Sequence, residues 1–289
     1  GVFYTSGFES PSTQPIWQAV NDGLPALDVL DFAGNIDAQY ALLRTSRNLY
    51  RRMGGVWQLV LGPGDADSLL GTDGSTIHNV TINKSNPSQV LATVGSPGLW
   101  GDANGWYVLI NDDYGDSWTA CNKAYNSGYT YGMSGMVAHG YTIALSCARG
   151  IGGLGSGTTV SWNGGNAWVN YVNLGYNATR PVHLNPLTGT IYVVTDILNN
   201  VDLAKITNSV GITTLQDGLG VNDSPDTGET RMMWFHPTES GTQRLIRNQH
   251  LYSTTDSWET YTDLGLLSYG ANRTAVDSSR SSDQMLLGL

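Results

Sequence analysis

The stretch Asn111-Asp112-Asp113-Tyr114-Gly115-Asp116-Ser117-Trp118 decides the fold of this chain, because variants of it recur further along the sequence. It lies between two strand-like runs and follows the pattern polar-x-Asp-x-Gly-x-Ser-Trp. The run Ser161–Trp168 is a second copy with Asn163 in place of the aspartate, and Ser253–Trp258 is a shortened third copy. Self-similarity at intervals of about 40–50 residues indicates a repeat architecture.

The copies share three parts, and each part has a physical role. A short Asp or Asn side chain accepts hydrogen bonds from backbone N–H groups two residues on. A glycine supplies the positive φ of a tight hairpin turn. A tryptophan begins the returning strand and lays an apolar surface over the hairpin and its neighbour. We assign these structural roles to the acceptors Asp113, Asn163 and Asp256, the glycines Gly115 and Gly165, and the tryptophans Trp118, Trp168 and Trp258.

The repeated phrase resembles the Asp-box of sialidase-like (BNR-repeat) β-propellers. That superfamily also includes the sortilin ectodomain and xyloglucan-degrading glycosidases. The resemblance implies a propeller of four-stranded antiparallel blades, with the box on the face opposite the ligand site, so the box does not imply catalysis. The chain departs from the sialidases in lacking a Phe-Arg-Ile-Pro motif near its start.

Following the repeat through its degenerate copies predicts an all-β, single-domain chain (residues 1–289) with six outer and six inner hairpins. These make a six-bladed propeller with about 48 residues in each four-stranded blade. Reading from Met285–Leu289 on to Gly1–Tyr4 reproduces the usual passage from an inner to an outer strand. We therefore expect the terminal strands to share one blade, which closes the ring and leaves no free sheet edge.

Composition narrows the possible partners. The net charge is −10 and the chain has only three lysines, which argues against non-specific nucleic-acid binding. No apolar run approaches the roughly 20 residues of a membrane span, so membrane insertion is not expected. The composition, rich in Asn, Gly, Ser and Thr and poor in Lys, is typical of a secreted or surface protein. Cys121 and Cys147 allow either one disulfide between neighbouring blades or two buried thiols.

Three arginines are the main candidates for ligand binding. Aligning inner strands by their turn prolines puts Arg180, Arg231 and Arg273 at one register in consecutive blades. Guanidinium groups that converge on a channel mouth would bind a carboxylate or phosphate. The alternative is that each arginine pairs with an acid in a neighbouring loop.

Further candidates lie at the same end of the predicted blades. The equivalent slots in other blades hold His78 and Asp28, Arg44 ends a second strand on this face, and Trp100 lies in a loop there. Asp65, Asp67 and Asp73 lie in a Gly-rich loop that would suit calcium, although a solvated acidic loop is the simpler interpretation. We expect no metal site and no cofactor.

These observations favour an extracellular or surface binding or scaffold module that recognises a glycan, a small anion or a surface protein. One alternative is a glycoside hydrolase of sialidase-like ancestry, although no pair of carboxylates matches that family. Another alternative is a structural subunit of a surface assembly, fibre or virion.

Overall fold

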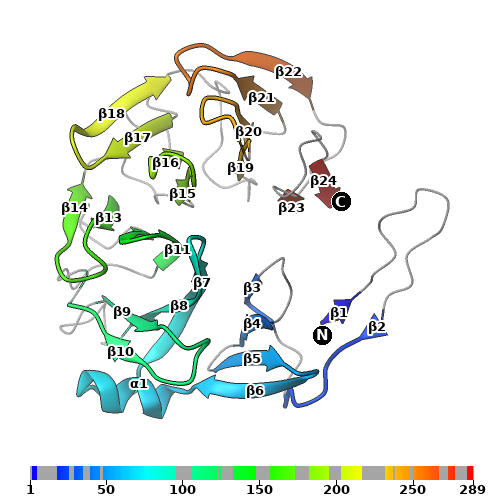
Figure 1. The fold of residues 1–289 in the computed structure, drawn as a ribbon, viewed down its shortest axis with the longest axis vertical. Coiled ribbons are helices and arrows are strands. Elements are labelled where there is room, and N and C mark those ends of the chain that lie inside the picture. Colours follow the sequence, from blue (N-terminus) through cyan, green and yellow to red (C-terminus); the bar gives the residue numbers. More distant parts are fainter. Residues whose placement is uncertain are drawn as a thin grey trace. The chain divides into compact units, whose positions relative to one another are not determined.

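The computed structural model describes residues 2–4, 18–25, 29–34, 40–45, 48–95, 106–122, 124, 133–147, 157–172, 182–194, 203–216, 232–236, 238–247, 250–266, 273–276 and 285–288. The chain consists of two compact units, Gly1–Asn126 and Ser127–Leu289. Almost all regular structure in these residues is antiparallel β-sheet, as predicted (Figure 1).

The first unit contains a hairpin and two four-stranded sheets. The hairpin pairs Phe3 with Ala19. In each four-stranded sheet the strands follow one another in chain order, and β3 and β4 of one sheet contact β7, the first strand of the next. The elements are β1 (Phe3–Tyr4), β2 (Gln18–Ala19), β3 (Asp31–Gly34), β4 (Tyr40–Arg44), β5 (Leu49–Met53), β6 (Val56–Leu61), α1 (Pro63–Leu70), β7 (Thr76–Asn83), β8 (Asn86–Gly95), β9 (Trp106–Asn111) and β10 (Thr119–Ala120).

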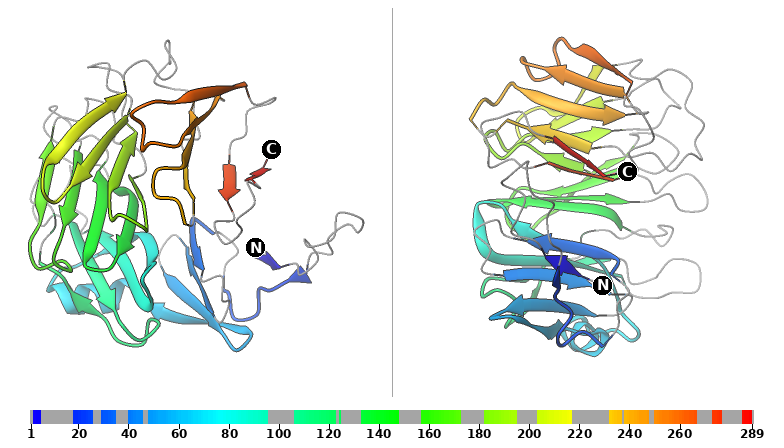
Figure 2. Two further views of the ribbon diagram at one scale, coloured as in Figure 1. Left: turned by 45° about the horizontal axis from the view of Figure 1, so that its top comes forward. Right: turned by 90° about the vertical axis from the view of Figure 1, so that its right-hand side faces the viewer.

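The second unit contains three four-stranded sheets of the same up-and-down kind and a final hairpin. Figure 2 shows the consecutive strands of these sheets side by side. The elements are β11 (Met133–His139), β12 (Thr142–Cys147), β13 (Gly157–Ser161), β14 (Val169–Val172), β15 (Val182–Leu184), β16 (Ile191–Val194), β17 (Leu203–Thr207), β18 (Gly211–Gln216), β19 (Met232–Phe235), β20 (Gln243–Arg247), β21 (His250–Thr254), β22 (Thr262–Leu266), β23 (Arg273–Val276) and β24 (Met285–Gly288).

Within the described ranges the chain thus forms five four-stranded sheets and two terminal hairpins. Each of the five sheets consists of two successive antiparallel hairpins, as expected of a four-stranded blade. The hairpins β1–β2 and β23–β24 belong to different units, so their union in one blade stays a prediction.

The prediction of an all-β chain, with Asp65 and Asp67 in a loop, is wrong for Pro63–Leu70, which forms α1. Pro63 stands at the first helical position, where the absence of an N–H costs nothing. The Asp65 carboxylate accepts the Gly62 N–H at 2.8 Å, and Gly71 ends the helix with φ 64°. Because only one residue of this helix, Ala66, is buried, hydrophobic periodicity in the sequence did not reveal it.

Nowhere in the part of the chain that the structure describes is there a helix of the length and apolarity that a bilayer span requires.

The three recurring phrases fold into turns with the same hydrogen bonds. The first residue of each turn accepts N–H groups two and four residues on: Asn111 from Asp113 and Gly115, Ser161 from Asn163 and Gly165, and Thr254 from Asp256 and Trp258. The third residue accepts the N–H four residues further: Asp113 from Ser117, Asn163 from Ala167, and Asp256 from Thr260. From the sequence, the Asp or Asn at the third turn position is expected to accept the N–H two residues further on. That type of bond is made instead by the first turn residue, at positions 111, 161 and 254.

Trp258 does not occupy the position expected for it. The hydrogen bonds align Trp258 with Gly115 and Gly165, and Tyr261 with Trp118 and Trp168. Trp258 has the positive φ of those glycines, 73° against 106° and 88°. The third copy is therefore full length, and Ser257-Trp258 only imitates the Ser-Trp ending of the first. A left-handed conformation costs a non-glycine residue about 1–2 kcal/mol, which burial of the whole indole offsets.

Two of these turns also fasten their own sheet to the preceding sheet of the same unit. Trp118 donates its indole N–H to the Val60 carbonyl at 2.9 Å. Arg51 on β5 binds the Tyr114 carbonyl at 3.0 Å and the Asp116 carboxylate at 2.9 Å. The turn between β9 and β10 is thus fixed on the outer strands of the sheet β3–β6.

Trp258 and Trp57 make equivalent connections elsewhere. In the second unit Trp258 packs in one cluster with Tyr192 and Leu203 of the preceding sheet. The Gln243 side chain joins the two sheets, because it accepts the Trp258 N–H at 2.7 Å and donates to the Tyr192 hydroxyl at 2.9 Å. In the first unit Trp57 on β6 donates to the Val20 carbonyl beside β2 at 2.6 Å.

The unusual position of Trp258 yields a stability test. Trp258→Ala should lower the free energy of unfolding by about 3–5 kcal/mol, because it empties a fully buried site. Trp258→Gly should be the more stable of the two variants by about 1 kcal/mol, since only glycine adopts φ 73° without strain. Denaturant unfolding of both proteins measures the difference. A Gly variant less stable than the Ala variant would contradict the assignment of Trp258 to a glycine position.

Candidate functional site

Most residues of the predicted anion site lie outside the described residues. This applies to Arg180, Arg231, Asp28 and Trp100. Arg273 begins β23, and its side chain is not among those described. The convergence of the three arginines therefore stays a prediction, and among these candidates the structure places only the side chains of His78 and Arg44.

His78 is half-buried on β7 among groups that keep it neutral. Its Nε2 lies 2.8 Å from the Thr76 hydroxyl, and its ring meets Trp106 edge-to-face at 4.5 Å. Burial and the nearby positive charge of Arg44 lower the pKa of His78 from 6.5 to about 4. Arg44 itself donates to the Ile77 carbonyl at 3.1 Å. At neutral pH His78 therefore adds no positive charge to an anion site.

Asp67, one of the three acids proposed for calcium, is bound to its own loop. Its carboxylate accepts hydrogen bonds from the Gly74 and Ser75 N–H groups at 2.9 and 2.8 Å and from the Thr72 hydroxyl at 3.1 Å. Asp65 caps α1. These two carboxylates therefore stabilise the helix and the connection from α1 to β7.

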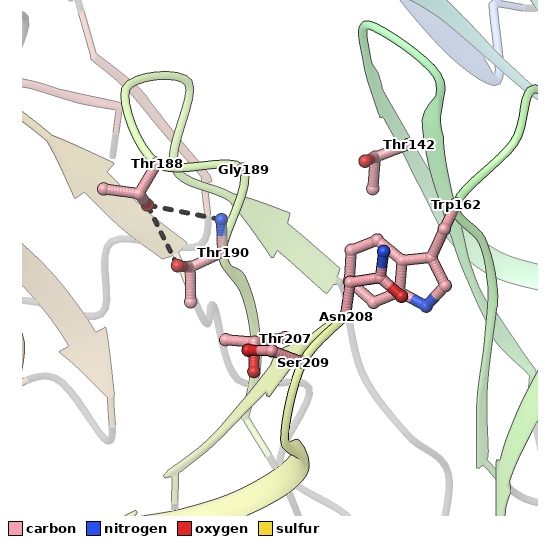
Figure 3. A pocket seen from close by; sticks show the side chains of 8 residues that line it. All are labelled: Thr142, Trp162, Thr188, Gly189, Thr190, Thr207, Asn208 and Ser209. Atoms are coloured by element: carbon pink, nitrogen blue, oxygen red, sulfur yellow. Dashed lines mark hydrogen bonds between the residues drawn. The ribbon is translucent and has the colours of Figure 1, made fainter.

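A groove of about 570 Å³ opens in the second unit between the sheets β11–β14 and β15–β18 (Figure 3). Thr142 and Trp162 lie on one side, from the starts of β12 and of the turn after β13. The turn after β15 lies on the opposite side. The eight lining residues are Thr142, Trp162, Thr188, Gly189, Thr190, Thr207, Asn208 and Ser209. The volume lies within the roughly 300–1,000 Å³ of typical ligand pockets.

The groove lies where the connection between sheets lacks a tryptophan. Seven residues separate β9 from β10, β13 from β14, and β21 from β22, whereas three, Asn208–Val210, separate β17 from β18. The stretch 182–216 contains no tryptophan. The sheet β15–β18 therefore has no counterpart of Trp118 or Trp258 to insert against the sheet before it, and the space remains open.

The lining combines one aromatic ring with neutral hydrogen-bonding groups. Trp162 packs against the buried cluster formed by the two sheets, so the indole is supported from below. On the opposite side the Thr188 hydroxyl donates to the Thr190 hydroxyl at 3.0 Å and accepts the Thr190 N–H at 3.2 Å. None of the eight lining residues is ionisable. Hydroxyl groups both donate and accept, so this surface matches a neutral polyhydroxylated ligand.

Sequence reasoning did not identify this groove. Trp162 appeared there only as part of the second copy of the recurring phrase. The feature that could have identified it is the tryptophan itself, because the same turn position holds a polar residue in the other two copies, Asp112 and Thr255. The resemblance placed ligands on the face opposite these turns, whereas Trp162, which lines the groove, belongs to one of them.

The fold of this chain resembles that of known structures. Among known protein families and curated proteins, none matches the sequence. The GH74 enzyme of Niastella koreensis matches with a TM-score of 0.50 and 14% identity over 81% of this chain, which spans 38% of that enzyme's length. YCF48 from Cyanidioschyzon merolae matches with a TM-score of 0.41 and 11% identity, over 83% of this chain and 86% of the YCF48 chain. A chain of a nidogen–laminin complex matches with a TM-score of 0.49 and 6% identity, over 84% of this chain and 81% of that chain.

The likeness to the GH74 enzyme concerns the fold alone. These structural relatives are β-propeller proteins. Together with the five four-stranded sheets, the likeness to the GH74 enzyme supports a β-propeller fold for this chain.

The environment of His78 predicts a pH effect on stability. Its pKa in the folded protein, about 4, lies below its ordinary value of 6.5, so protons bind preferentially to the unfolded chain between these values. Stability should therefore fall as the pH drops from about 6.5 to 4. His78→Gln should lose less stability than the wild type over this range. Chemical unfolding at pH 7 and at pH 4.5 measures both, and an NMR titration of His78 near pH 6.5 would contradict the prediction.

Proposed function

We propose that this chain is a secreted or surface-exposed module that binds a neutral glycan, built as one six-bladed Asp-box propeller. The three seven-residue turns with shared hydrogen bonds support the Asp-box assignment. The five sheets and the two terminal hairpins are the elements that such a ring needs. The glycan proposal depends on one observation, the uncharged groove beside Trp162.

A sugar ring suits this groove because it has two kinds of surface. Its faces expose C–H groups, and these pack on an aromatic ring supported as Trp162 is. Its edges carry hydroxyl groups that donate and accept hydrogen bonds, as do the threonine and serine hydroxyls and the Asn208 amide. An apolar surface with a few placed polar groups is the usual composition of a small-molecule site.

The chemistry of the groove separates this proposal from its alternatives. An anionic ligand would need a cationic partner, and the lining supplies none. Glycoside hydrolysis generally uses two carboxyl groups on either side of the scissile bond, and the lining contains no carboxyl group either. The groove therefore supports binding without cleavage.

Substitutions in the groove provide the test. Trp162→Ala and Asn208→Trp should each weaken binding of a neutral polysaccharide by at least about tenfold, the first by removing the aromatic surface and the second by filling the groove. Affinity electrophoresis in gels that contain galactomannan, mixed-linkage glucan or xyloglucan, with pectate and hyaluronan as acidic counterparts, identifies the retained polymer. Isothermal titration then gives the affinity of each variant.

Thr255→Ala is the matched control for Asn208→Trp. Thr255 is exposed on the corresponding turn of another sheet and does not line the groove, so this variant should bind as the wild type does. Thermal unfolding of each variant shows whether the fold is intact. Retention by acidic polymers alone, or full binding by Asn208→Trp, would refute the proposal.

A further inference from the structure

We propose that Tyr141 and Trp162 form two neighbouring stacking positions, so that the groove binds several consecutive units of a neutral glycan chain rather than a single terminal sugar. This inference rests on the proposed function and specifies its ligand. It concerns the tip of the turn between β11 and β12, which adjoins the groove through Thr142.

The Tyr141 ring is exposed, yet its position is defined. The side chain is 79% exposed, the largest fraction among the exposed large hydrophobic residues that the structure describes. Its carbonyl accepts the Gly164 N–H at 2.8 Å, which ties the tip to the turn that follows Trp162. The ring rests against Gly164, because a β-carbon at that glycine would lie 3.4 Å from Tyr141 Cδ1. Trp162 and Gly164 lie two residues apart in the same turn, so this one turn places both aromatic rings.

Folding does not account for this arrangement. A ring that remains 79% exposed buries little apolar surface and contributes little to stability. The contact with Gly164 nevertheless restricts its orientation, so less entropy is lost when a ligand covers it. An exposed aromatic ring held beside a hydroxyl-lined groove is therefore better explained by binding than by packing.

Exposed apolar side chains also adjoin lining residues in the chain on the side opposite Trp162. Leu187, 46% exposed, precedes Thr188, and Val210, 73% exposed, follows Ser209. The polar lining is thus flanked by apolar tips of three turns, with Tyr141 on the Trp162 side. A ligand that covers Trp162 and also reaches these tips must extend beyond one ring. A chain of linked sugars, each with apolar faces and hydroxyl edges, meets this requirement.

The dependence of affinity on chain length tests the inference. The probes are the monosaccharide and the oligosaccharides up to the hexasaccharide, prepared from the neutral polysaccharide that the wild type retains. Wild-type affinity measured by isothermal titration should rise by at least about tenfold between the monosaccharide and the hexasaccharide. Tyr141→Ala should lower hexasaccharide affinity to nearly that of the monosaccharide, and it should leave monosaccharide affinity unchanged because a single ring covers Trp162 alone. Tyr141→Phe should preserve the dependence on length.

Leu266→Ala serves as the control, because it removes another exposed apolar side chain, 66% exposed on β22, and should change neither affinity. Equal affinity of the wild type for the monosaccharide and the hexasaccharide, or an equal loss of both in Tyr141→Ala, would overturn the inference. Either result would leave the proposed function intact if Trp162→Ala still weakened polysaccharide binding by at least about tenfold. Unchanged binding in Trp162→Ala would instead refute the proposed function itself.

Discussion

A short polar side chain that binds the backbone of its own turn is the interaction on which the rest of this structure depends. Two consecutive left-handed residues, such as Tyr114 and Gly115, turn the chain sharply, and the N–H groups of Asp113, Gly115 and Ser117 point into the turn. Asn111 and Asp113 accept those N–H groups, so the turn satisfies its own polar groups. Because the turn is fixed internally, the residue after it lies at a fixed place. Trp118 at that place reaches the neighbouring sheet.

The groove lies where a turn of this kind is missing, between β17 and β18. The sheet β15–β18 is well packed, with Leu184, Ile191 and Ile206 almost wholly buried. Its sheet pairing and core therefore do not depend on a box turn. The short turn between β17 and β18 removes only the element that would cover Trp162. A local change in turn length thus leaves a groove open between two sheets and leaves the hydrophobic core unaffected.

The sequence predicted the fold better than the site because the two depend on different information. Turn residues and strand alternation are local signals, and each of the three recurring phrases forms a turn between two antiparallel strands. The register of the third copy was wrong, because Ser257-Trp258 imitates the Ser117-Trp118 ending and only hydrogen bonds distinguish them. The neutral state of His78 depends on burial and on Arg44, which is 34 positions away in the chain. The groove depends on the absence of a tryptophan from the turn between β17 and β18, and a search for sequence motifs does not detect a missing residue.

The fully buried Trp258 and the half-buried Trp162 give the second unit two very different indoles. The indole N–H of Trp258 is bonded to Gln243 inside the core, so its surroundings are the same whatever occupies the groove. Trp162 borders the groove. The surroundings of one indole therefore depend on what fills the groove, whereas those of the other change only when the fold is lost.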